Sequence, residues 1–242
     1  MLSKLIYQAF FEGSARGSAQ EVGAGQRHDI LRKGERSPYV TMVIDGWAAS
    51  YTQLSHGPRQ LHTIFLPGDL CDSGVSHTGV LDYSVMALSR VRLACLPREL
   101  FDGLTEGHPA LARAVWRQEL LQAAMLRQLT TAIGTKPAHE RLAHVLAEIF
   151  LRMQARGYTE NDSCPFLITQ SDLAELVGLT PVHVNRMLQL LRRDGLIVQG
   201  GRTLRIPDMQ RLLQVARLDP AYLGLGKVSA PEEEPDPRPM AL

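Results

Sequence analysis

The pattern of hydrophobic and polar positions divides this 242-residue chain into regions of different character. A short apolar stretch that predicts a helix and a Gly/Ser/Ala linker fill about the first 18 residues. Between residues 20 and 100, short apolar runs are bounded by glycine, proline and Asp-Gly: YVTMVIDG, WAASYTQL, LHTIFLPGD, YSVMALS and VRLACLP. Regularly spaced short strands with turn signals indicate an all-β sandwich or barrel.

From residue 109 to about 134 the apolar positions recur at helical spacing, among them Leu111, Val115, Leu121, Met125 and Leu129. This pattern predicts one long helix, whose abundant apolar residues suggest a second partner in addition to the barrel. Pro137 ends it, and residues 138–156 form a second amphipathic pattern.

The most specific pattern is the segment TQSDLAELVGLTPVHVNRMLQLLRRDGLIVQGGRTLR, residues 169–205. Thr169, with an acid three residues later, resembles a capping box, and Gly178 is suited to end the short helix that follows. Thr180 and Pro181 are an N-cap and a first-turn proline for a second helix. Two helices joined by so tight a turn predict a helix-turn-helix unit.

The second helix has one apolar stripe, formed by Val184, Met187, Leu188 and Leu191. After it, residues 196–198 and 203–206 flank Gly-Gly and predict a two-stranded hairpin, here called the wing. A short closing helix is expected over residues 208–215. Together these elements predict a winged helix-turn-helix.

Charge supports an interaction with nucleic acid. The whole chain carries a formal charge of only +1, yet residues 181–205 hold five arginines and one acid, Asp194. A local basic face is what contact with DNA phosphates requires. A solvated helix and hairpin in an ordinary α/β protein, or a winged helix that binds another protein, would also fit this pattern.

Other functional classes find little support. No apolar run approaches the ~18 residues of a membrane span. The stretch LIYQAFF is too short for a signal-peptide core, so we expect no membrane association and a cytoplasmic protein. The three cysteines form no Cys-x-x-Cys pair, and neither a metal site nor a cofactor is predicted. A cupin-like barrel enzyme is the alternative class, but no His-x-His cluster or other catalytic motif is present.

The order of β-barrel, long helix and winged helix-turn-helix resembles the Crp/Fnr family of bacterial transcription regulators. The motif FLPGD at residues 65–69 and the Arg-Leu-Ala opening at residues 141–143 carry the resemblance, together with the helix-turn-helix. It covers roughly residues 20–218. It implies an α+β fold with an N-terminal jelly-roll β-barrel, a homodimer formed through the long helix, and a palindromic site on double-stranded DNA.

The domain boundaries expected on this basis divide the chain into four parts. These are an N-terminal helix and barrel over residues 1–107, a dimerisation helix over 108–136, a DNA-binding domain over 137–218, and a disordered tail over 219–242.

The resemblance also implies roles in DNA contact. The family's most frequent base-contacting arginine falls on Arg186, which would bind a guanine edge. A frequent acidic base contact falls on Val182, which can only pack on a thymine methyl, and Pro181 replaces an arginine found in some members. Asn185 and Gln189 are candidates for further base contacts. Positions that tend to touch phosphate fall on Gln170, Thr180, His183 and Arg202.

The β-barrel, which the resemblance implies is a sensor domain, lacks the ligand-binding residues of the cyclic-AMP-binding members. Their Gly-Glu-Leu turn falls on Asp72, Ser73 and Gly74, and their phosphate-binding arginine falls on Asp82. An aspartate repels a cyclic phosphate, so binding of cyclic AMP in the usual mode is not expected. Residues 1–30 contain no cysteine, which excludes the N-terminal iron–sulfur cluster of the oxygen-sensing branch.

Other sensing mechanisms stay open. Candidate haem ligands are His28, His56, His62, His77 and Cys71, but nothing in their spacing selects a pair. Cys71 and Cys95 are candidates for redox sensing, although lone cysteines are more often buried small hydrophobic residues. The remaining options are an unidentified small ligand and control by protein abundance alone. The effector is therefore unknown. By family analogy, the loop at residues 157–164 is a candidate contact for RNA polymerase.

Overall fold

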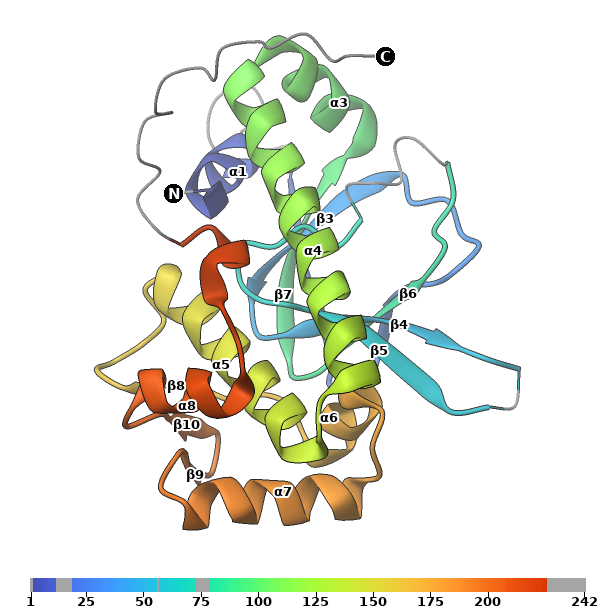
Figure 1. Cartoon of the computed structure of the whole chain (residues 1–242). Coiled ribbons are helices and arrows are strands. Elements are labelled where there is room, and N and C mark those ends of the chain that lie inside the picture. Colours follow the sequence, from blue (N-terminus) through green and yellow to red (C-terminus); the bar gives the residue numbers. More distant parts are fainter. Residues whose placement is uncertain (1, 12–18, 56, 73–78, 226–242) are drawn as a thin grey trace, which may run out of the picture.

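A computed structural model describes residues 2–11, 19–55, 57–72 and 79–225. The β domain lies beside the long helix α4 (Pro109–Thr135), and the C-terminal helices lie at the far end of that helix (Figure 1). The predicted α+β class, with an N-terminal jelly roll and a C-terminal winged helix-turn-helix, is confirmed.

The β domain consists of two antiparallel sheets. One sheet has the order β1-β7-β3, with β1 at Gln20–Ala24, β7 at Val91–Pro97 and β3 at Tyr39–Asp45. The other has the order β2-β6-β4-β5, with β2 at Asp29–Leu31, β6 at Ser84–Ala87, β4 at Ala48–Gln53 and β5 at Arg59–Phe65. The facing sides share an apolar core that includes Val43, Phe65, Val85 and Leu93. Among the described residues, the strands form two open sheets rather than a closed ring of hydrogen bonds.

Two strands and a helix of this domain were not predicted. The sequence of β1, QEVGA, is almost wholly exposed, and β2 has three residues, so neither presents a clear apolar alternation. Helix α3 (Arg98–Gly107) buries only Phe101 and Leu104. Its two glycines weaken the helical pattern in the sequence.

Three helices cover the outer side of the β1-β7-β3 sheet. Buried side chains of β3 and β7, such as Met42 and Leu96, pack with Ile6 and Phe10 of α1 (Leu2–Phe11) and with residues of α3 and α4. The long helix therefore lies against the barrel on one side. The linker expected after α1 falls mainly on residues 12–18, outside the described ranges.

The C-terminal domain is built around α5 (Ala138–Ala155), which is buried along most of its length. Around it lie α6 (Gln170–Val177), α7 (Pro181–Arg193), α8 (Met209–Ala216) and a three-stranded sheet of β8 (Ser163–Pro165), β10 (Thr203–Arg205) and β9 (Val198–Gly200). The predicted wing is present, with Gly201 in its turn at a φ of 57°. The third strand, β8, was not predicted.

The chain segment after α8 departs from expectation. Residues from 219 onward were assigned to a disordered tail, yet Pro220–Leu223 forms a short 3-10 helix, η2. Leu223 is buried, and the Tyr222 hydroxyl donates a hydrogen bond to Glu148 of α5 at 2.6 Å. The rest of the expected tail, residues 226–242, lies outside the described residues.

One apolar core joins the barrel to the C-terminal domain. Trp47 of the barrel packs edge-to-face on Phe166, with ring centroids 6.1 Å apart. Leu61 and Leu66 belong to the same cluster as the buried residues of α5, α6 and α7. The helix-turn-helix is therefore packed directly against the barrel.

Candidate nucleic-acid interface

The helix-turn-helix is fixed by the local interactions that its sequence predicts. The Thr169 hydroxyl accepts a hydrogen bond from the Asp172 backbone at 3.2 Å, while the Asp172 carboxylate accepts from the Thr169 backbone at 3.0 Å. Gly178 ends α6 at a φ of 66°, in the left-handed region that favours glycine. Thr180 caps α7, its hydroxyl accepting from the His183 backbone, and Pro181 follows it. The predicted caps and the turn are confirmed.

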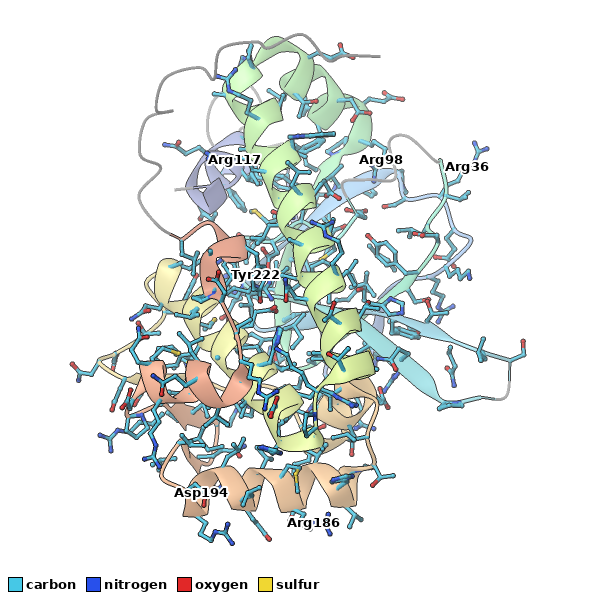
Figure 2. The ribbon with its side chains drawn as sticks, viewed as in Figure 1. Arg36, Arg98, Arg117, Arg186, Asp194 and Tyr222 are labelled. Atoms are coloured by element: carbon cyan, nitrogen blue, oxygen red, sulfur yellow. The ribbon has the colours of Figure 1, made fainter. Side chains whose placement is uncertain are left out.

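Helix α7 has one buried and one exposed face. The predicted apolar stripe of Val184, Met187, Leu188 and Leu191 is buried. On the other face Arg186 and Gln189 are exposed, and Val182 is 81% exposed. Arg186 points away from the body of the protein at its lower edge (Figure 2). The face that carries the candidate base contacts is thus open to a ligand the size of DNA.

The five arginines of the basic segment divide into two groups. Three have partners: Arg192 donates to Gln199 at 2.8 Å, Arg193 lies 3.2 Å from Asp194, and Arg205 lies 2.7 Å from Asp162. Among the described residues, the exposed side chains of Arg186 and Arg202 make no hydrogen bond or ion pair. These two guanidinium groups are therefore available to an external anion or base.

A chain of amides connects α6 to α7. Asn185 donates to the Gln170 side chain at 2.9 Å and accepts from Gln189 at 2.9 Å. Asn185 is partly buried and engaged on both sides, so it holds its neighbours in place. The side chain of Gln189 lies at the exposed end of this chain.

The candidate DNA contacts fall in two places. Most lie at the start of α6, in the turn and on α7, where hydrogen bonds link Gln170 to Asn185, Asn185 to Gln189, and Thr180 to His183: Gln170, Thr180, Val182, His183, Asn185, Arg186 and Gln189. Arg202 lies apart from them in the wing turn, where its backbone carbonyl accepts from the Phe166 backbone at 2.7 Å. Helix α7, through Arg186, and the wing, through Arg202, can therefore contact DNA at two separate points.

The barrel turn that aligns with the cyclic-nucleotide motif is only partly described, because Ser73 and Gly74 lie outside the described residues. Asp72 is fully buried, accepts from the Thr41 backbone at 2.8 Å and lies 3.3 Å from Arg98. Burial raises the pKa of the Asp72 carboxyl to about 6. Asp82, at the position of the phosphate-binding arginine, is exposed.

Three of the five candidate haem ligands, His28, His62 and Cys71, fall on described residues. His56 and His77 lie outside the described residues. His28 is exposed on a turn, whereas His62 is about half-buried and its pKa is lowered by that burial. Within the described part of the chain, no three His, Cys, Asp or Glu side chains are grouped as a metal site would require.

Burial disfavours the thiolate form of both candidate redox cysteines, because it raises the pKa of Cys71 and of Cys95. Burial raises the pKa of the Cys71 thiol well above its usual range, which disfavours the reactive thiolate. The Cys71 backbone N–H donates to the Thr41 carbonyl on one side of β3, and Cys95 of β7 is the strand partner of Thr41 on the other side. Two strand spacings place their Cα atoms roughly 10 Å apart, beyond the reach of a disulfide.

A cavity that the sequence did not predict opens between the two sheets. Its volume is about 620 Å³, and its walls include Val22, Leu31, Leu81 and Leu93, with Arg36 among the polar residues. This size falls within the range of small-molecule pockets.

Comparison with known proteins identifies the architecture. The cyclic nucleotide-binding domain matches residues 24–108, and the Crp-like helix-turn-helix domain matches residues 140–215. The chain belongs to the Crp/Fnr family. It is 27% identical over 197 residues to the transcriptional activator protein FnrL of Cereibacter sphaeroides, covering 80% of this chain and 78% of the relative. The transcriptional activator protein anr of Pseudomonas aeruginosa is 25% identical, over 77% of this chain and 76% of its own length.

Two solved structures share the fold of this chain. FixK2 from Bradyrhizobium japonicum superimposes with a TM-score of 0.70 at 25% identity, over 81% of this chain and 96% of that one. A CooA mutant from Carboxydothermus hydrogenoformans shares the fold, with a TM-score of 0.67 at 16% identity over 86% and 94% of the two chains.

Membership of the Crp/Fnr family settles the class of function. The protein is a DNA-binding transcription regulator, and the alternative of a cupin-like enzyme is excluded because the family consists of regulators. None of the helices in the described ranges has the length and apolarity of a membrane span.

Proposed function

We propose that this Crp/Fnr regulator acts as a homodimer that places two α7 helices on the half-sites of a palindrome. The observation that carries the proposal is the open face of α7, a capped helix with a buried opposite side, where the exposed Arg186 has no ion-pair partner among the described residues. Arginine binding to guanine O6 and N7 is the commonest specific base contact. Half-sites one turn apart require recognition helices separated by roughly 34 Å.

The remaining contacts follow from position. Val182 packs on a thymine methyl, and Gln189, held by Asn185, contacts a base edge. Four residues at the ends of the helices and in the wing bind phosphates: Gln170, Thr180, His183 and Arg202. Phosphate contacts fix the position of the helix on the duplex, whereas base contacts select the sequence.

An apolar stripe on α4 supports the dimer. Trp116 is 64% exposed and Leu120 is 52% exposed, and the stripe continues to Ala123, after which the same register carries the polar residues Arg127 and Thr130. The spacings of four and three residues between Trp116, Leu120 and Ala123 match the seam of a two-stranded coiled coil. The opposite side of α4 packs on the barrel, so the exposed stripe is available to a second copy.

Dimerisation is tested by sedimentation velocity on the wild type and the double variant Trp116→Ala, Leu120→Ala. The wild type sediments as a dimer, and the variant as a monomer with weakened DNA binding. Leu54→Ala is the matched control, because Leu54 is 70% exposed but lies between β4 and β5. Unchanged association in the double variant contradicts the α4 seam.

The effector is a molecule other than cyclic AMP bound in the usual mode. Two carboxylates support this proposal: Asp82 at the position of the phosphate-binding arginine, and the buried Asp72 already paired with Arg98. Titration with cyclic AMP leaves the DNA affinity unchanged. A large cyclic-AMP-dependent rise in affinity contradicts it.

Residues 157–164 form the contact for RNA polymerase. Tyr158 is 45% exposed there, and the loop is anchored by the Asp162–Arg205 ion pair and by a bridge between Glu160 and Ser163. Tyr158→Ala lowers activated transcription in vitro while DNA affinity is unchanged. Parallel losses of both contradict this role.

A further inference from the structure

Strand β5 is attached to the C-terminal domain at both of its ends. At its start, Arg59 and Gln60 contact α6, the first helix of the helix-turn-helix. Just after its end, Asp69 of the FLPGD turn contacts α5. Neither attachment involves the exposed face of α7.

The attachment at Asp69 is a buried ionic cluster. Asp69 is 4% exposed, and its carboxylate accepts hydrogen bonds from Arg152 at 2.9 Å and from Arg156 at 2.5 Å. Arg152 lies in the last turn of α5 and Arg156 is the C-cap residue directly after the helix, and Arg152 also donates to the Ile64 carbonyl at 2.8 Å. One carboxylate of the barrel thus fixes the C-terminal end of α5.

The charges in this cluster balance. Glu148 lies 3.8 Å from Arg152, so two acids face two arginines. Charges that are buried together give little net stability, because desolvation offsets their attraction, but their geometry is strongly defined. The cluster is therefore better suited to fix an orientation than to hold the two domains together.

The attachment at the start of β5 is less buried. Arg59 donates two hydrogen bonds to the Glu175 carboxylate, at 2.7 and 3.0 Å, and its side chain is 21% exposed. Gln60 donates to the Leu176 carbonyl at 3.1 Å. A bidentate arginine–carboxylate pair defines direction as well as distance.

We infer that Asp69 and Arg59 are positioning residues for DNA binding, which together hold the helix-turn-helix in the orientation that presents α7 to DNA. The apolar contact between the two domains, such as that of Trp47 on Phe166, is non-directional and does not by itself fix a rotation, whereas polar attachments at both ends of β5 oppose one. The inference rests on the proposed dimer, because two rigidly oriented helices are needed to meet both half-sites at once. If loss of one attachment left only about one molecule in ten with its helix-turn-helix in the DNA-binding orientation, the apparent affinity for DNA would fall about tenfold.

The test is a charge swap at the accessible pair. Arg59→Glu and Glu175→Arg each place like charges together, and the double variant restores opposite charges with the net charge of the wild type. Arg90→Glu is the control for charge alone, because Arg90 is exposed on the barrel and its side chain makes no hydrogen bond or ion pair among the described residues. Asp69→Asn is the second variant, in which one oxygen still accepts a hydrogen bond, the other is replaced by an NH2 donor, and the charge is lost.

Two readouts are measured on the full-length dimer. The first is affinity for the preferred palindrome and for its isolated half-site, both obtained by selection from random duplexes. The second is acrylamide quenching of Trp47, which is 1% exposed at the contact with Phe166 and reports on the interface without DNA. A Trp116→Phe background removes the other tryptophan signal, and its dimerisation is checked by sedimentation.

We expect each single swap variant and Asp69→Asn to lose about tenfold in palindrome affinity, with much less change for the half-site and with increased quenching of Trp47. The double swap recovers both. Unchanged palindrome affinity in the single variants, or a double swap that recovers neither readout, overturns the inference. Absence of sequence-preferred binding by the wild type would instead refute the proposed function, and Trp47 quenching would still report on the attachment.

Discussion

Two sides of the same C-terminal domain use arginine in opposite ways. On the side away from the barrel, Arg186 and Arg202 are exposed and make no ion pair among the described residues. On the barrel side, the buried Arg152 and the partly buried Arg156 pair with one buried aspartate. Burial and pairing, rather than residue type, therefore separate an arginine that is available to DNA from one that orients the domain.

The largest effect is expected on the buried side. Arg152→Ala leaves Glu148 and part of the Asp69 carboxylate without their charged partner, and breaking such a buried pair costs about 3–5 kcal/mol. Arg193→Ala, which removes an exposed arginine beside Asp194, changes stability by at most about 0.5 kcal/mol. Urea unfolding of the two variants measures the difference. Equal losses would remove the distinction between the two sides.

A second buried carboxylate extends the comparison to pH. The pKa of Asp72 is about 6 in the folded protein against an ordinary value of 3.8, so between these values the folded state binds more protons than the unfolded state. Its contribution to stability is therefore greatest below about pH 4 and is lost as the pH rises through about 6. Relative to Asp72→Asn, the wild type loses roughly 3 kcal/mol of unfolding free energy across this window.

Urea unfolding at about pH 4, 5, 6 and 7 measures that difference for each pH. Asp82→Asn is the control, because Asp82 is exposed. If the difference in unfolding free energy between wild type and Asp72→Asn stays constant with pH, or changes in the opposite direction, the raised pKa of Asp72 is contradicted.

The smallest effect concerns the N-terminus of α7. Thr180→Ala removes the hydroxyl that accepts from the His183 backbone and lowers stability by about 1 kcal/mol. Thr180→Ser retains the cap and most of the stability. Thermal unfolding distinguishes the two, and equal losses would show that the hydroxyl does not act as a cap.

The two sides also differ in how far the sequence predicts them. The caps at Thr169 and Thr180, the turn at Gly178 and the buried stripe of α7 all depend on residues within a few positions of one another. Such patterns are visible in a sequence, and the structure contains each of them. Arg186 was placed on the exposed side of α7 for the same reason.

The attachments to the barrel depend on contacts between distant residues. Asp69 and Arg152 are 83 positions apart, and Arg59 and Glu175 are 116 positions apart. The FLPGD motif was noticed only as a family resemblance, because no local pattern shows which helix its aspartate contacts. Strand β8 was missed for a related reason: its three residues acquire their strand geometry by pairing with β10.

The central claim is that α7 binds specific bases through Arg186, and selection from random duplex DNA tests it most directly. The wild type is predicted to enrich a palindrome with guanine at one position of each half-site. Arg186→Ala is predicted to lose discrimination at that position alone, by about 1–3 kcal/mol per half-site, while Arg193→Ala retains it. Enrichment of the same sequences with the same affinity by wild type and Arg186→Ala would contradict the account.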